Sequence, residues 1–233
     1  SVAVHYHDNK HGAEELASRL SNPSVVIQAK LGDLEDVRLL FKKASEALGP
    51  LDVLVNCAAA ESQNVSDLSD ISDDLWSNTM TTNLDAPMLL TQLFSAQEAL
   101  GKKGGGSIIN ISSIAGLRAH SQTPYTTTKT AVIGLTFSMA ADHGKDNIRV
   151  NCIAPGLLHT PMTAPRMNEE QREQRKSAAP LGTEGTAWDV GWAAVFLASE
   201  EARWITGIVL PVEAGLTVTS PVTYTTIGQQ ARF

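Results

Sequence analysis

Short apolar segments alternate with longer amphipathic segments along the first quarter of the chain. The longer segments repeat apolar residues at helical spacing, whereas the short ones are rich in valine, isoleucine and leucine. The strand-like segments are residues 2–6, 24–29 and 51–56, and the helical ones are residues 10–20 and 34–48. Such alternation predicts an α/β fold in which helices cover both faces of a parallel sheet.

The alternation continues through most of the remaining chain. Further helices are predicted at residues 73–100, 125–144 and 186–198, and further strands at residues 107–112, 148–154 and 205–212. A chain of 233 residues is long enough for one sizeable core and short for two. We therefore expect a single domain that spans residues 1–233.

Two segments do not fit the alternation. Residues 157–180 are polar and charged, which is typical either of a solvated helical insertion or of a mobile lid over a substrate, and both interpretations stay open. Residues 217–233 contain threonines and glutamines without clear periodicity. We expect this C-terminal tail either to pack on a neighbouring subunit or to be loose.

Composition and charge narrow the classes of function. The net charge of −7 argues against nucleic acid as the main partner, and no apolar run is long enough to cross a membrane. No secretory leader precedes the first strand, which favours a cytoplasmic protein. Cys57 and Cys152 each lie in an apolar, strand-like stretch, so we expect two buried thiols rather than a disulfide.

The chemistry is concentrated between residues 112 and 129. Tyr125 and Lys129 lie four residues apart and project from one helix face, where an ammonium would lower the pKa of the phenol. The strand before this helix ends in the hydroxyls of Ser112 and Ser113, followed by Gly116. Open α/β sheets place their chemistry at such strand ends. The pattern therefore predicts an acid/base site.

These motifs closely resemble those of the short-chain dehydrogenase/reductase family, in the same order over nearly the whole chain. The resemblance implies a Rossmann-like, doubly wound sheet and a hydride transfer between a nicotinamide cofactor and a ketone or secondary alcohol. It implies that Tyr125 is the proton donor and acceptor, and that Lys129 holds the nicotinamide ribose and lowers the tyrosine pKa. Ser113, with Ser112 as the alternative, would hydrogen-bond the substrate oxygen. Asn83 would anchor a water in the proton relay.

The resemblance also implies cofactor contacts at several strand ends. Asn56-Cys57-Ala58-Ala59 resembles the Asn-Asn-Ala-Gly turn of the family, with two substitutions, and Gly32-Asp33-Leu34 resembles its acidic site at adenine. The segment from Pro155 to Thr160 resembles the one that holds the nicotinamide carboxamide. The expected cofactor contacts are Asp33, Leu34, Asn56, Ala58, Tyr125, Lys129, Pro155, Gly156, Leu158 and Thr160.

One departure concerns the glycine-rich Thr-Gly-x-x-x-Gly-x-Gly turn of the family, which has no counterpart in this sequence. Residues 1–6 resemble the second strand of the family, so one strand-turn-helix unit is expected to be missing from mid-sheet, leaving unpaired backbone and a cavity. Three explanations stay open. The chain is a fragment, another segment such as 217–233 or a partner chain fills the gap, or the chain is a natural truncation that binds no dinucleotide.

The identity of the nicotinamide cofactor also stays open. His7 and Lys10 suit a 2′-phosphate, whereas Asp8 suits a free ribose hydroxyl, so NADP is slightly favoured over NAD. No metal is expected, because His5, His7 and His11 have no acidic or cysteine partner at ligand spacing.

We expect a small carbonyl or alcohol as substrate and a homodimer or homotetramer built on helices 73–100 and 125–144. Two other functions stay open. One is a non-redox isomerase, lyase or cyclase that uses the same pocket, and the other is a non-catalytic partner subunit.

Overall fold

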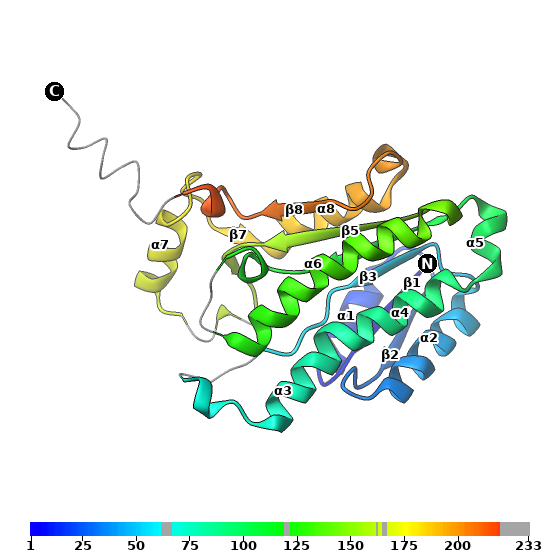
Figure 1. Ribbon diagram of the computed structural model, residues 1–233, viewed down its shortest axis with the longest axis horizontal. Coiled ribbons are helices and arrows are strands. Elements are labelled where there is room, and N and C mark those ends of the chain that lie inside the picture. Colours follow the sequence, from blue (N-terminus) through cyan, green and yellow to red (C-terminus); the bar gives the residue numbers. More distant parts are fainter. Residues whose placement is uncertain (62–66, 119–121, 162, 165–166, 220–233) are drawn as a thin grey trace.

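The structure is a computed structural model that describes residues 1–61, 67–118, 122–161, 163–164 and 167–219 (Figure 1). Its main strands are all parallel and form two ladders. One ladder pairs β1 with β2, and the other has the order β3-β4-β5-β8. The strands are β1 (Val2–Tyr6), β2 (Ser24–Gln28), β3 (Val53–Asn56), β4 (Gly106–Ile111), β5 (Ile148–Pro155) and β8 (Val209–Val212). The predicted α/β fold with a parallel, Rossmann-like sheet is confirmed.

Helices cover both faces of the larger ladder. In β4, Ile108 packs in the core cluster that contains Phe94 and Met139, whereas Ile109 packs in the cluster that contains Leu197. Successive strand residues point to opposite faces, so α4 and α6 lie on one side of the sheet and α8 on the other (Figure 1). The α-helices are α1 (Lys10–Ser18), α2 (Leu34–Leu48), α3 (Asp73–Met80), α4 (Ala86–Ser95), α5 (Glu98–Lys103), α6 (Thr123–His143), α7 (Glu169–Ser177) and α8 (Ala187–Ala198).

The predicted long helix at residues 73–100 is divided in the structure. After α3 the chain makes a π-helical turn, Thr81–Asp85, and continues as α4 and then α5. The division has a physical reason at Pro87, near the start of α4. In an uninterrupted α-helix, residue 87 would donate its N–H to the carbonyl of Asn83, and proline has no N–H to donate. Single π turns of this kind occur frequently at functional sites.

The two ladders meet without hydrogen bonding to each other. Among the described strands, β1 pairs only with β2, and β3 pairs only with β4. Ala3 of β1 and Leu54 of β3 nevertheless pack on the same core cluster, which also contains Val37 of α2 and Leu90 of α4. The ladder is thus interrupted where the sequence analysis expects a mid-sheet strand to be missing, while one helical layer spans the interruption.

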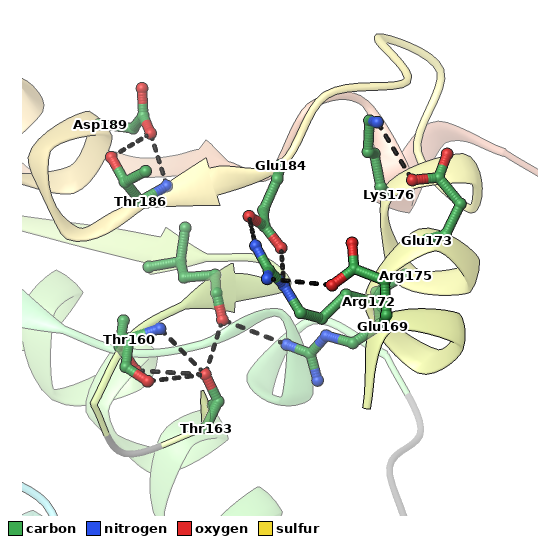
Figure 2. Close-up of polar contacts among 11 residues, drawn as sticks. Thr160, Thr163, Glu169, Arg172, Glu173, Arg175, Lys176, Glu184, Thr186 and Asp189 are labelled. Carbon is green, nitrogen blue, oxygen red and sulfur yellow. Dashed lines mark hydrogen bonds and ion pairs between the residues drawn. The ribbon is translucent and has the colours of Figure 1, made fainter. Parts of the chain in front are cut away.

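Residues 157–180 contain helix α7, which two arginines connect to neighbouring segments of the chain. The Arg172 guanidinium donates to both carboxylate oxygens of Glu184, from Nε to Oε1 at 3.0 Å and from Nη2 to Oε2 at 2.7 Å (Figure 2). Arg175 donates to the carbonyl of Leu158 at 3.4 Å. No residue of α7 is buried, which agrees with a solvated helix at Glu169–Ser177. The lid function of this segment stays a prediction.

Two short strands accompany the α7 segment. They are β6 (Leu158–His159) and β7 (Gly185–Thr186), which form a separate parallel pair. The predicted tail falls largely on residues 220–233, which lie outside the described residues. Within the described ranges, no helix combines the length and hydropathy that a membrane span requires.

Candidate active site

The end of β4 and the start of α6 bring Ser113 and Tyr125 together. Ser113 follows β4 and begins the 3-10 turn Ile114–Gly116, where its hydroxyl accepts a hydrogen bond from the Ala115 N–H at 3.1 Å. The Ser113 side chain also hydrogen-bonds the Tyr125 side chain. Burial raises the pKa of Tyr125, and the hydrogen bond to Ser113 opposes that shift. The phenol is therefore protonated near neutral pH and has a hydroxyl partner.

Gly116 explains how the turn after β4 approaches α6 so closely. A Cβ at this position would lie 2.6 Å from the carbonyl oxygen of Lys129 and 2.9 Å from the Ser112 hydroxyl. Ser112 is buried and donates its hydroxyl to the same Lys129 carbonyl at 2.7 Å. Ser112 thus fastens the strand end to α6, whereas Ser113 is the serine that reaches Tyr125.

Lys129 is buried one helical turn after Tyr125. Its Nζ lies 5.5 Å from the centroid of the Tyr125 ring and donates to the Ile111 carbonyl at 2.8 Å. Burial lowers the pKa of Lys129 to about 8. The pKa of Tyr125 is raised in this structure, with burial as the largest cause, and the lowering by Lys129 that the resemblance implies stays a prediction.

Asn83 lies in the π turn and is fully engaged by neighbouring groups. Its Nδ2 donates to the Ala60 carbonyl at 2.9 Å and to Thr128 Oγ1 at 3.1 Å. Its Oδ1 accepts from the Ala60 N–H at 2.7 Å. Thr128 lies on α6 between Tyr125 and Lys129, so Asn83 connects the loop after β3 to the helix that carries both.

Asn56 ends β3 with one buried acceptor unsatisfied. Its Nδ2 donates to Asn110 Oδ1 at 2.8 Å, whereas its own Oδ1 has no hydrogen-bond partner among the described residues. A buried polar atom without a partner is costly, so a donor from another molecule or segment would be stabilising here. Ala58, two residues on, is exposed.

The second group of expected cofactor contacts follows β5. Pro155 ends this strand, and a Cβ on Gly156 would lie 2.6 Å from the Cβ of Glu213, so only glycine fits. Leu158 and Thr160 continue towards α7. Thr163 accepts from the Thr160 N–H at 3.0 Å and donates to the Leu158 carbonyl at 3.0 Å, as Figure 2 shows.

Asp33 and Leu34 lie after β2, at the start of α2. The Asp33 carboxylate accepts from the Glu35 N–H at 2.9 Å and caps the helix, and Leu34 is its first residue. The ends of β2, β3, β4 and β5 all precede expected site residues, so both ladders present them at their carboxyl ends. The expected cofactor contacts after β2, β3 and β5 therefore all lie at carboxyl ends of parallel strands.

The histidines near the N-terminus contact nearby residues, and the two cysteines form no disulfide with each other. His5 contacts the Ala29 carbonyl at 2.9 Å, and His7 contacts the Asp8 carboxylate at 2.9 Å. Both thiols are free, as expected, but only Cys152 is buried. The expectation for Cys57 is wrong because β3 ends at Asn56, which leaves Cys57 in the exposed segment that follows.

Several neighbours of the site carry no recognisable sequence signal. Thr128 is one of three consecutive threonines, and nothing in the sequence distinguishes the one that meets Asn83. Glu61 is near enough to Tyr125 to raise the pKa of the phenol. The pairing of Arg172 with Glu184 joins residues twelve positions apart across two turns, which spacing alone does not reveal.

Several known proteins resemble this chain in sequence and in fold. Residues 1–217 match the family described as Enoyl-(Acyl carrier protein) reductase. The chain is 33% identical over 220 residues to the 3-oxoacyl-(acyl-carrier-protein) reductase FabG of Staphylococcus aureus, an alignment that covers 93% of this chain and 87% of the relative.

Two solved structures are similar to this chain in fold as well as in sequence. A 4-hydroxyisoleucine dehydrogenase complexed with NADH is 29% identical with a TM-score of 0.81, covering 94% of this chain and 88% of that one. A blue fluorescent protein from a metagenomic library, in complex with NADPH, is 32% identical with a TM-score of 0.83, covering 92% and 86%.

Proposed function

Because the chain belongs to the short-chain dehydrogenase/reductase family, we propose that it reduces a ketone or oxidises a secondary alcohol, with Tyr125 as general acid and base. Membership makes it an NAD(P)-dependent oxidoreductase. One observation carries the assignment of the chemistry. The hydroxyls of Ser113 and Tyr125 are hydrogen-bonded at the end of β4, with the Lys129 amine buried beside the ring.

Each side chain has a separate task in this proposal. Ser113 donates to the substrate oxygen, and Tyr125 gives its proton to that oxygen as negative charge develops there. Lys129, when protonated, stabilises the phenolate that remains. The reverse reaction uses the same groups to remove the proton of an alcohol. The nicotinamide, when bound, supplies or accepts the hydride.

The residues of the site fit a dinucleotide. The unsatisfied Oδ1 of Asn56 is a buried acceptor at a strand end, where open α/β sheets bind such ligands. We propose that Asp33, Leu34, Asn56, Ala58, Pro155, Gly156, Leu158 and Thr160, together with Tyr125 and Lys129, form the cofactor site. NADP or NAD is the cofactor, since relatives of comparable similarity were solved with NADH and with NADPH.

The α7 segment is the proposed substrate lid. A cavity of about 360 Å³ is lined by Leu157, Met167, Gln171, Gln174, Arg175 and Ala178. A second one, of about 190 Å³, lies between Leu158, Arg175, Leu181 and Val212. The larger cavity has apolar and amide side chains and one arginine, and the smaller one has apolar and charged side chains, so both suit a substrate with an apolar body and polar groups.

The activities named for two relatives indicate which substrates to test first. One relative is a 3-oxoacyl reductase and another is a hydroxy amino acid dehydrogenase, which represent a ketone and a secondary alcohol. Oxidation of NADPH and NADH should first be followed by absorbance with a 3-oxoacyl thioester and with simple diketones. The reverse direction should be assayed with a 4-hydroxy amino acid.

Tyr125→Phe then tests the proposal with whichever substrate turns over. The variant keeps the ring and loses the hydroxyl, so kcat should fall by roughly 10²- to 10⁴-fold. Circular dichroism should match the wild type, and NADPH affinity, measured by nicotinamide fluorescence, should change by at most a few-fold because the aromatic ring is kept. Near-normal turnover in Tyr125→Phe would reject the assignment of Tyr125, and failure of the wild type to bind either nucleotide would favour a cofactor-free reaction or a non-catalytic subunit.

A further inference from the structure

One side of α7 lines the larger of the two cavities. Gln171, Gln174, Arg175 and Ala178 lie at intervals of three and four residues, which places them on the same side of the helix. Leu157 lines the cavity too, and it belongs to the segment after β5 that holds expected nicotinamide contacts. The cavity therefore borders the edge of the sheet where the chemistry is proposed.

Arg175 is the one charged side chain among the residues that line the larger cavity. The others are apolar or carry amides: Leu157, Met167, Gln171, Gln174 and Ala178. The Arg175 side chain is half-buried and also lines the smaller cavity. One guanidinium is thus common to both cavities.

The protein supplies little compensation for the charge of Arg175. Within the described ranges, its one hydrogen bond runs from Nη2 to the Leu158 carbonyl at 3.4 Å, as Figure 2 shows. A hydrogen bond of that length is weak, and a guanidinium has five N–H donors. No carboxylate of the described residues lies within ion-pair distance of Arg175. Most of its donors are therefore available to a ligand.

Arg172, one helical turn earlier, has the opposite environment. It donates to both carboxylate oxygens of Glu184, at 3.0 and 2.7 Å, and to Glu169 at 3.5 Å (Figure 2). Glu184 is near enough to act on the charge of Arg175, but its two oxygens are taken by Arg172. Helix α7 thus carries one guanidinium that is paired with a carboxylate and one that is not.

The other two carboxylates that line the smaller cavity also have donors of their own. Asp189 accepts from the Thr186 N–H at 2.7 Å and from its hydroxyl at 2.9 Å. Glu213 accepts from the Thr217 N–H at 2.5 Å. Neither forms a hydrogen bond with Arg175.

A half-buried cation without an anionic partner is costly. Burial lowers the pKa of Arg175, which shows that its charged form is disfavoured where it lies. An anion that entered the cavity would remove this cost. The planar guanidinium fits two oxygens of one anionic group through parallel N–H bonds, so a carboxylate or a phosphate has the required geometry.

The surrounding charges favour a carboxylate over a phosphate. Glu184 and Glu213 are both close to Arg175 on the wall of the smaller cavity, and they repel a dianion more strongly than a monoanion. A phosphate monoester carries about two negative charges at neutral pH, whereas a carboxylate carries one. The apolar side chains of Leu157 and Met167 suit the aliphatic chain that would join the carboxylate to the reacting carbon.

We propose that Arg175 binds a carboxylate of the substrate, which rests on the oxidoreductase function proposed above and narrows its substrates to oxo acids and hydroxy acids. The carboxylate takes no part in the redox step. In that step the carbonyl carbon gains the hydride of the reduced nicotinamide, and the carbonyl oxygen gains the proton of Tyr125.

The test compares ketones that differ only in charge. Reduction of 4-oxopentanoate and of 5-oxohexanoate by NADPH and NADH should be measured beside reduction of the matching primary amides, in a buffer without carboxylate or phosphate. The two acids place the ketone at different distances from the carboxylate. For the better acid, kcat/KM should exceed that of its amide by roughly 10- to 100-fold.

Arg175→Met tests whether this preference depends on Arg175. The variant keeps an unbranched side chain and loses the charge, so the ratio of kcat/KM for acid and amide should fall to about 1. A ratio within one protein cancels any change that affects both substrates. Lys176→Met, which removes a positive charge that is paired within α7, is the control and should keep the wild-type ratio.

Hydroxyacetone phosphate tests the choice of anion. It is a methyl ketone of similar length to 4-oxopentanoate and carries a dianionic group. Its kcat/KM should be lower than that of the better acid. A higher value would overturn the assignment of the site to a carboxylate.

Binding without nucleotide separates the carboxylate site from the redox function. Ligand-observed NMR of the full chain with 4-oxopentanoate should detect binding to the wild type and its loss in Arg175→Met. Such binding without turnover of any ketone would support the carboxylate site and count against the oxidoreductase function. Equal turnover of acid and amide by the wild type, or a preference unchanged in Arg175→Met, would overturn the carboxylate site and leave the oxidoreductase function standing. Absence of both binding and turnover would overturn the carboxylate site as well.

Discussion

The amine of Lys129 lies 5.5 Å from the centroid of the Tyr125 ring and is hydrogen-bonded to the carbonyl of Ile111. The two side chains share a buried volume, and burial disfavours the charged form of each. It raises the pKa of Tyr125 and lowers that of Lys129 to about 8. At neutral pH the pair therefore consists of a neutral phenol and an ammonium that is held at a free-energy cost.

This cost predicts a pH dependence of stability. Lys129 binds its proton less tightly folded than unfolded, so between its lowered pKa near 8 and its ordinary value the unfolded chain binds more protons. Stability must therefore rise with pH in this window. Between about pH 7.5 and 9.5, the Lys129 contribution to the free energy of unfolding should rise by about 2 kcal/mol.

Urea unfolding of the wild type and of Lys129→Met across that range provides the measurement. The methionine side chain is similar in length and carries no proton, so the difference between the two proteins isolates the lysine. Working below pH 9.5 avoids Tyr125, whose raised pKa makes stability fall only above its ordinary value near 10. Parallel pH profiles for the two proteins would show that Lys129 is not desolvated.

Alanine substitutions of the two serines after β4 should differ in their effect on kcat/KM. Ser113→Ala removes the hydroxyl that meets Tyr125, so kcat/KM should fall by roughly 10²-fold. It also removes the cap of the 3-10 turn, which should cost about 1 kcal/mol of stability. Ser112→Ala removes the bond to the Lys129 carbonyl, which should cost about 1 kcal/mol of stability. Its kcat/KM should stay within a few-fold of wild type. The reverse pattern, measured by initial rates and urea unfolding, would exchange the roles of the serines.

Gly116→Ala should damage the site through close packing alone. The added methyl would lie 2.6 Å from the Lys129 carbonyl, so the turn that carries Ser113 must move away from α6. We expect a loss of about 1–3 kcal/mol of stability and at least about tenfold in kcat/KM.

Gly134→Ala is the matched control on the same helix. Nothing lies within 4 Å of a Cβ at position 134, so the substitution should add up to about 1 kcal/mol of stability and leave kcat/KM unchanged. Equal effects of the two alanines would mean that helix propensity, and not contact with the turn, governs both positions.

The sequence predicted the parts of the site that depend on regular spacing. Tyr125 and Lys129 share a face because they are four residues apart on a helix, and the strand before Ser113 delivers it to the carboxyl edge of a parallel sheet. Side-chain orientation at irregular turns was not predictable in the same way. The resemblance favoured Ser113 and kept Ser112 as the alternative, and the structure separates them: Ser112 bonds the Lys129 carbonyl, and Ser113 meets Tyr125.

The π turn before α4 and the pKa of Tyr125 could not be predicted from the spacing of apolar residues. The helix predicted over residues 73–100 has an uninterrupted helical pattern, and its π turn depends on a missing backbone donor at Pro87, which the pattern of side chains does not record. The pKa of Tyr125 depends on how deeply the phenol and Lys129 are buried together. The four-residue spacing shows that Lys129 lies near Tyr125, but it does not show that burial disfavours the positive charge of Lys129.

The Arg172–Glu184 pair should control how firmly α7 closes on the substrate. It joins α7 to the segment before β7 by two charge-assisted hydrogen bonds, and residues of α7 line the larger cavity (Figure 2). Arg172→Met should therefore raise the KM of the carbonyl substrate by roughly three- to tenfold and leave NADPH affinity unchanged. Arg172 also holds the pKa of Glu184 below its usual range, so the wild-type pair should persist to a lower pH than an ordinary glutamate would allow.

Lys176→Met is the control for a general loss of charge on α7. Lys176 pairs with Glu173 at 3.1 Å, and both residues belong to α7, so this pair ties the helix to nothing else. Initial rates over a range of substrate concentrations, at about pH 7, should give a raised KM for Arg172→Met and a wild-type KM for Lys176→Met. If both variants raise KM equally, the net charge of α7 acts on the substrate and the link to Glu184 does not. If neither does, α7 is an insertion that the substrate never meets.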